Sequence, residues 1–427
     1  MARDRATDAA AAASLGLRLA SILLLFAAQL LLTRTLSLEA FGAFAFALAW
    51  VKALGIAATL GAERLIVRDA AAHAVRQEWA ALRLLVGWLA RTLLVSALAV
   101  GAAAALVFWA AAPGASWLPV LWIALLLLPL TALLRIAQHV LAGLQRPLVA
   151  QLPEMIVQPL LFLGGAAALA LGGSLAAASG MAAQVAAAAL AAALGIRLLL
   201  RALPAASTEA RQAAAPERRW RSVSAMFVAT ASMSLLAAAP MLLLGIMSGP
   251  AEAGIMAVAR SLADLTLVPI LAFGSVMGPL IGRLAAEGDR GALQRSFTAF
   301  ARRSSLAVLP VAVALFLLRE PLLALFGEAF TAGATALSIL LVGQVAGALA
   351  GSNALLLSTL GHERIVAFAS AGCLAGGTLA MALLIPPYGI TGAACGAAAA
   401  SILWNLLLSV ATRKLAGLSP GAFASSR

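Results

Sequence analysis

The stretch Arg197–Arg221 reads RLLLRALPAASTEARQAAAPERRWR, and it is the longest polar interruption in an otherwise apolar sequence. Its six arginines and two glutamates keep it out of a bilayer, and Pro204 and Pro216 interrupt helix formation within it. The segments on either side have similar lengths, and each has room for about six membrane-spanning helices. The sequence therefore predicts three parts, an N-terminal six-helix lobe (1–200), a basic linker (201–222) and a C-terminal six-helix lobe (223–427).

The composition is that of a polytopic, all-α membrane protein. Hydrophobic residues make up 63% of the chain and charged residues 11%, whereas soluble domains carry about 25% charged residues. The mean hydropathy of +1.04 and the repeated long apolar runs leave no soluble alternative. Twelve transmembrane helices can be placed, at residues 14–34, 40–62, 84–112, 118–141, 149–171, 174–200, 223–247, 254–281, 304–318, 331–358, 365–386 and 389–411.

The basic residues predict how these helices are oriented. With both termini in the cytoplasm, 22 of the 29 lysines and arginines fall in cytoplasmic segments and five fall inside spans. Only Arg34 and Arg319 fall in the segments on the opposite side of the membrane. This asymmetry predicts an N-in, C-in, multi-pass protein whose linker is cytoplasmic. The net charge of +13 is spread over the segments between spans, so it predicts membrane orientation and no nucleic-acid partner.

The two halves contain similar motifs in the same order. The paired motifs are offset by about 212 to 218 residues, and they predict a duplicated six-helix bundle with a pseudo-twofold axis along the membrane normal. A cleft between two such bundles is the natural route for a substrate. The pairs are EAFGAFAFA from Glu39 with EAGIMAVAR from Glu252, GLQR from Gly143 with GHER from Gly361, and GGSLAAASG from Gly172 with YGITGAACG from Tyr388.

Three longer runs carry a family resemblance. They are LLLTRTLSLEAFGAFAFALAWVKALGIAATLGAERLIVR (30–68), REPLLALFGEAFTAGATALSILLVGQVAGALAGSNALLLSTLGHER (319–364) and LIPPYGITGAACGAAAASILWNLLL (384–408). They resemble Wzx-type polysaccharide flippases, a branch of the multidrug/oligosaccharidyl-lipid/polysaccharide (MOP) exporter superfamily.

The resemblance implies a MATE-like, V-shaped pair of lobes in the bacterial cytoplasmic (inner) membrane. Such a protein moves an oligosaccharide linked to undecaprenyl pyrophosphate from the inner to the outer leaflet by alternating access. Its product serves O-antigen, exopolysaccharide or capsule synthesis. The implied partners are this lipid-linked oligosaccharide, membrane lipids, and the polymerase and co-polymerase of the same pathway.

Five basic side chains lie inside the predicted spans, where an ionised group costs roughly 2.5–3.5 kcal/mol at the bilayer centre on insertion scales. Lys52 is about midway along its span, Arg260 about two turns from an outer end, and Arg18 nearer a cytoplasmic end. The resemblance implies that these three bind the anionic head group. Arginine matches phosphate oxygens in a bidentate fork, and lysine acts as a point charge. Arg91 and Arg135 lie near cytoplasmic ends, so snorkelling explains them as well as binding does.

Two acids also lie inside the spans. Glu154 stands between two prolines that should distort its helix, so we interpret it as a cation or proton site or as the partner of an arginine such as Arg135. Asp264 follows Arg260 by four residues, so it would either pair with this arginine or serve as a coupling site. Four amides could reach sugar hydroxyls in a cleft, but interhelical hydrogen bonding is the favoured explanation for them: Gln138, Gln344, Asn353 and Asn405.

The sequence favours a carrier over an enzyme. No histidine has a carboxylate or cysteine at metal-ligand spacing, no glycine-rich phosphate loop with lysine is present, and we expect no cofactor. A membrane polymerase or ligase would need a long extracytoplasmic loop, which the span assignment lacks. A cation-coupled multidrug exporter of the MATE type remains the main alternative. It would need acids for a cationic substrate, and the five basic residues against two acids favour an anionic one.

Overall fold

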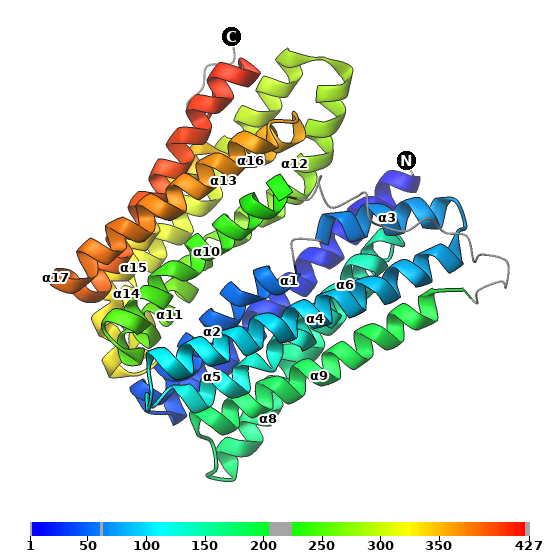
Figure 1. Cartoon of the computed structure of the whole chain (residues 1–427). Helices are drawn as coiled ribbons and strands as arrows, with labels where there is room; N and C mark the ends of the chain where they lie inside the picture. The colour runs from blue at the N-terminus through cyan, green and yellow to red at the C-terminus, as the bar shows by residue number, and fades with distance from the viewer. Residues whose placement is uncertain (1, 60–62, 205–223, 423–427) are drawn as a thin grey trace. The chain divides into compact units, whose positions relative to one another are not determined.

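The computed structural model describes residues 2–59, 63–204 and 224–422, and this part of the chain consists of helices and their connections without any strand (Figure 1). The predicted all-α class is therefore confirmed for these residues. Within them, nine helices are long and apolar enough to cross a membrane. The chain divides into two compact units, Met1–Phe227 and Val228–Arg427. Most of the predicted linker lies outside the described residues.

The first unit is built around α6 (Leu127–Gly143), which packs against α3 (Glu63–Val75), α4 (Trp79–Ala111) and α9 (Ala177–Ala202). Gly143 permits a close approach to α3, because a Cβ there would lie 2.7 Å from the backbone oxygen of Val67. The other elements of this unit are α1 (Ala2–Thr35), α2 (Leu38–Thr59), α5 (Leu118–Leu125), α7 (Pro147–Leu152), the π turn η1 (Pro153–Val157) and α8 (Gln158–Leu171).

Two predicted spans of the first unit are broken near proline. The span at 118–141 forms α5 and α6, which meet at Leu126, three residues before Pro129. The span at 149–171 forms α7, η1 and α8, and the π turn lies between Pro153 and Pro159. Proline lacks the N–H that continues the α-helical ladder, so a local change of hydrogen-bond pattern is expected at each break. The predicted distortion of the helix around Glu154 is confirmed.

The second unit is built around α15 (Ala334–Ala350), which packs against α11 (Pro250–Asp264), α13 (Arg290–Leu317) and α17 (Glu363–Ala411). The contact with α17 is close, because a Cβ at Gly343 would lie 3.2 Å from the Cα of Ala398. The other elements are α10 (Ser224–Met247), α12 (Leu267–Glu287), α14 (Arg319–Ala324), the 3-10 turn η4 (Glu328–Gly333), α16 (Asn353–Thr359) and the π turn η5 (Thr412–Ala416).

The long helix α17 is two helices joined at Gly389. This glycine has φ 52° and ψ −128°, which is not helical and is open only to glycine at low energy. Pro386 and Pro387 precede it, and each removes a donor from the helical ladder. The break coincides with the boundary between the predicted spans at 365–386 and 389–411.

Helices α4 and α13 carry matching anchors, and their sequences ALRLLVGWLAR (81–91) and ALQRSFTAFAR (292–302) align without a gap. In the first unit, Arg83 Nη2 donates to the backbone oxygen of Leu203 at 3.1 Å, just after α9. In the second unit, the matching Gln294 exchanges two hydrogen bonds with the backbone of Ser419 at 2.7 and 2.9 Å, just after η5. Arg83 and Gln294, which occupy equivalent positions in the two aligned stretches, thus bind the segments that follow α9 and η5, respectively. This correspondence extends the repeat found in the sequence.

Candidate functional site

Arg260, Asp264 and Gln344 form a polar cluster in the second unit, where α11 packs against α15. Arg260 Nε donates to Asp264 Oδ1 at 2.8 Å, and Gln344 Nε2 donates to the same oxygen at 3.3 Å. The first contact is the helical i, i+4 pair anticipated from the sequence. The second adds an interhelical bond, so the structure brings together three of the residues singled out by sequence.

The cluster is positioned by a break in the predicted span at 254–281. Helix α11 ends at Asp264 and α12 begins at Leu267, because Pro269 has no N–H and its ring clashes with the preceding turn. Thr266 is fully buried, and its Oγ1 donates to the backbone oxygen of Ala263 at 2.7 Å. The acid therefore stands at the carboxyl end of one half-helix, a place where membrane transporters commonly build polar sites.

Arg260 and Asp264 are only partly covered. Their side chains are 32% and 41% exposed, respectively. Within the described residues, the terminal Nη atoms of Arg260 and the Oδ2 atom of Asp264 have no hydrogen-bond partner. The guanidinium is thus held through its Nε atom, while its two Nη atoms remain available to a bidentate acceptor.

Lys52 lies on the exposed side of α2 in the first unit. From Phe41 to Ala53, every residue is buried except Leu48, Trp50 and Lys52, and among these three only Lys52 is exposed. Lys52 is therefore the exposed residue within a stretch of α2 that mostly faces the core of its unit. This placement is compatible with the predicted role in anion binding.

Arg18 and Glu154 lie on touching segments of the first unit. Ser14 Oγ donates to Gln151 Oε1 at 2.9 Å, which ties α1 to α7. Arg18 follows Ser14 by one turn, and Glu154 follows Gln151 by about one turn. Both side chains are partly buried, and no ion pair joins them within the described residues. The π turn around Glu154 packs against α1 and α9, so it places a carboxylate close to the helix that carries Arg18.

The expected pair of Glu154 with Arg135 is not formed in the described part of the chain. Arg135 lies on α6, where its backbone oxygen is 2.7 Å from His139 Nδ1. Arg91 is exposed on α4.

Asn353 is a buried link between helices and not a residue of an open cleft. Its side chain is buried, with an exposed fraction of 1%. Its amide donates to Ser409 Oγ and accepts from Thr412 Oγ1, both at 3.1 Å. The favoured interpretation, interhelical hydrogen bonding, is what the structure shows, because Asn353 joins α16 to the end of α17.

Sequence reasoning missed the role of Glu252. One of its carboxylate oxygens is buried without a hydrogen-bond partner in the described structure. It packs against the break in α17, since a Cβ at Gly389 would lie 3.2 Å from its Oε2 atom. The repeated motif beginning at Glu252 was the available signal, but nothing in it indicated a neighbour more than one hundred residues away.

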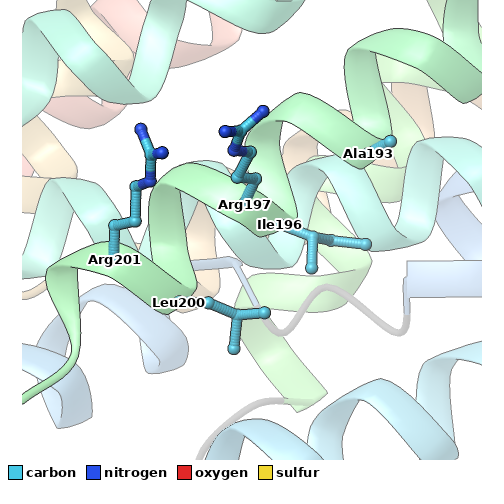
Figure 2. A pocket seen from close by; sticks show the side chains of 5 residues that line it. All are labelled: Ala193, Ile196, Arg197, Leu200 and Arg201. Carbon is cyan, nitrogen blue, oxygen red and sulfur yellow. The ribbon is translucent and has the colours of Figure 1, made fainter.

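A hollow of about 570 Å³ lies along α9 and is separate from the predicted site residues. Figure 2 shows Arg197 and Arg201 extending side by side from the helix, with Ile196 and Leu200 directed away from them. Both arginines are exposed near the end of α9. Their aliphatic stems cover apolar surface while their guanidinium groups reach out, as snorkelling side chains do. We therefore assign this hollow no part in the site.

Among the residues that the structure describes, no group of three or more histidines, cysteines, aspartates and glutamates is arranged to hold a metal ion. The polar clusters of the two units are instead made of guanidinium, ammonium, carboxylate and amide groups on apolar helices. Together with the nine long apolar helices of the described residues, they define a multi-pass helical membrane protein.

Solved structures with the same fold are transporters. The inward-facing conformation of a multidrug resistance MATE family transporter of the MOP superfamily matches with a TM-score of 0.72 and 12% identity, over 92% of this chain and 94% of that one. The lipid II flippase MurJ, in an inward closed conformation, matches with a TM-score of 0.65 and 10% identity, over 94% and 87%. A MOP superfamily transporter from Pyrococcus furiosus matches with a TM-score of 0.65 and 14% identity, over 94% and 93%.

The particular family follows from the sequence. The model of the polysaccharide biosynthesis protein family matches residues 11–285, and the chain belongs to this family. The resemblance to polysaccharide flippases is thus confirmed at the level of family and fold. No curated protein matches the chain significantly by sequence.

Proposed function

We propose that this protein is a flippase for oligosaccharides linked to a polyprenyl pyrophosphate. It carries them from the inner to the outer leaflet of the bacterial cytoplasmic membrane by alternating access. The observation that carries the proposal is Arg260, whose partly exposed side chain lies one turn before the break between α11 and α12. Membership in the polysaccharide biosynthesis family supplies the class of cargo.

The proposed topology has twelve spans, six in each lobe, with both termini and the linker in the cytoplasm. Three spans then consist of paired elements, α5 with α6, α11 with α12, and α15 with α16, and one is the broken set α7, η1 and α8. Helix α17 supplies the last two spans on either side of Gly389. The asymmetric distribution of arginine and lysine supports this arrangement.

The proposed head-group site uses Lys52, Arg18 and Arg260, with Arg91 and Arg135 as further cations along the cytoplasmic half. A pyrophosphate needs several donors at once, because its charge is spread over several oxygens. Cations on separate helices hold it without enclosing it, and an open surface leaves the bulky sugar in water. The apolar polyprenyl chain remains in the lipid.

Export is favoured by the membrane potential in this scheme. Moving two negative charges outward across an inside-negative membrane gains about 4–5 kcal/mol per 100 mV, if both cross the field without neutralisation. Glu154 is the proposed site for a coupling proton or cation, because it lies in a π turn beside the helix that carries Arg18.

A second candidate is a cation-coupled multidrug exporter, favoured by the fold match to a MATE family transporter. A cationic drug would need carboxylates that face it. The carboxylate of Asp264, however, already accepts a hydrogen bond from Arg260. The polar surface that these two residues form therefore ends in the guanidinium, which is cationic. Drug resistance conferred by expression of this protein, without any change in surface polysaccharide, would favour the second candidate.

The test is genetic. After deletion of the gene, lipid-linked repeat units should accumulate on the inner leaflet, and the unaltered gene should restore surface polysaccharide. A Lys52→Ala copy should restore little. Lys414→Ala serves as the matched control, because Lys414 is the only other lysine and is exposed on η5 beyond the last helix. Normal polysaccharide export in the deletion strain would refute the proposed function.

A further inference from the structure

Arg260, Asp264 and Gln344 form a short chain of hydrogen bonds between α11 and α15, with the carboxylate of Asp264 in the middle. Asp264 Oδ1 is shared, since it accepts from Arg260 Nε at 2.8 Å and from Gln344 Nε2 at 3.3 Å. Because Arg260 and Gln344 donate to the same oxygen, each weakens the hydrogen bond that the other makes with the carboxylate. The arginine is therefore neither fully neutralised nor isolated.

We infer that Asp264 and Gln344 are positioning residues that set how tightly Arg260 binds the phosphate groups of the cargo lipid. Asp264 acts as a counterion that stays beside Arg260 and lowers its affinity for the head group, and Gln344 moderates this counterion from α15. The inference rests on the proposed function and adds two residues with opposite effects. Arg260 remains the group that touches the cargo.

The geometry supports this division of roles. Asp264 holds the Nε edge of the guanidinium, so a phosphate can approach the two Nη atoms without first displacing the carboxylate. A fully exposed arginine beside a multiply charged head group would bind strongly and release slowly. A carrier needs a site that is strong enough to load and weak enough to unload, as ion pathways also do. A carboxylate held beside the cation reduces the affinity without removing the recognition.

The two neighbours should therefore shift binding in opposite directions. Asp264→Asn keeps the shape but removes the competing charge, so Arg260 should bind a pyrophosphate about tenfold more tightly. Gln344→Leu removes one donor from Asp264, so the carboxylate should hold Arg260 more firmly and weaken pyrophosphate binding about threefold. In the Asp264→Asn background, Gln344→Leu should have little further effect, because the charge on which it acts is gone.

The experiment measures binding of farnesyl pyrophosphate to the purified full-length protein in detergent, with farnesol as the uncharged comparator. Asn405→Leu is the matched control. Asn405 is a polar residue of α17 that lies beside α15, where a Cβ at Gly347 would be 3.3 Å from its Nδ2 atom. Its amide donates to the backbone oxygen of Ser401 in its own helix. This control should leave pyrophosphate binding unchanged.

We expect Asp264→Asn and Gln344→Leu to shift the affinity for farnesyl pyrophosphate in opposite directions. We also expect Asp264→Asn to export more slowly in cells. General damage to the fold would weaken binding in both variants, so a shift in the same direction overturns the inference. If the unaltered protein binds farnesyl pyrophosphate no better than farnesol, the proposed function itself fails. The two failures are thus distinguishable in one set of measurements.

Discussion

Alanine at Gly389 should destabilise the second unit through two separate effects. The backbone there has φ 52° and ψ −128°, which an L-residue adopts only with strain. The new Cβ would also lie 3.2 Å from Glu252 Oε2, which is a tight contact, and 3.6 Å from Oε1, which is an ordinary one. Strain and crowding together should cost about 2–4 kcal/mol.

A glycine in the same helix provides the control. Gly372 lies within the first half of α17, and nothing stands within 4 Å of a Cβ built on it. Gly372→Ala should therefore be neutral or stabilise by up to about 1 kcal/mol through helix propensity. Adding Glu252→Ala to Gly389→Ala should relieve the crowding but not the backbone strain, so it should recover only part of the loss.

The assay is thermal unfolding of the purified protein in detergent, followed by tryptophan fluorescence. A loss of about 2–4 kcal/mol in a unit of this size corresponds to a fall in Tm of about 4–16 °C. Equal Tm values for Gly389→Ala and Gly372→Ala would refute the reasoning. They would mean that α17 can pass through this position as an ordinary helix.

Three further outcomes are expected. Lys52→Arg should retain part of the export activity that Lys52→Ala loses, since the charge is kept but its geometry changes; equal loss in both, measured as surface polysaccharide, would contradict a charge-based role. Asn353→Leu should lower the free energy of unfolding by about 1–3 kcal/mol, because Thr412 loses its buried acceptor; an unchanged Tm would contradict this. Arg83→Ala should make the chain after Leu203 more susceptible to limited proteolysis, because two hydrogen bonds to this segment are lost; an unchanged cleavage rate would show that the anchor is dispensable.

Much of the helical organisation could be predicted from the sequence, because it depends on apolar run length and on proline and glycine. The distortion at Glu154 followed from the two prolines that flank it, and the break at Gly389 falls where the last two predicted spans meet. The pair of Arg260 with Asp264 followed from helical spacing alone.

Contacts between helices distant in sequence could not be predicted in this way. Spacing says nothing about which helix faces Asp264, so its bond to Gln344 became visible only once α11 and α15 were seen to pack. The same limit applies to the carboxylate of Glu252 beside Gly389. The burial of Asn353 also depends on the end of α17, which lies more than fifty residues further along the chain.

The most direct test of the central claim is transport in a reconstituted system. The purified protein is placed in liposomes that carry a fluorescent polyprenyl-pyrophosphate oligosaccharide in one leaflet, and its appearance in the other leaflet is followed with a membrane-impermeant quencher. We predict protein-dependent transfer that falls sharply with Lys52→Ala and is retained with Lys414→Ala. Transfer at the rate of protein-free liposomes would contradict the account.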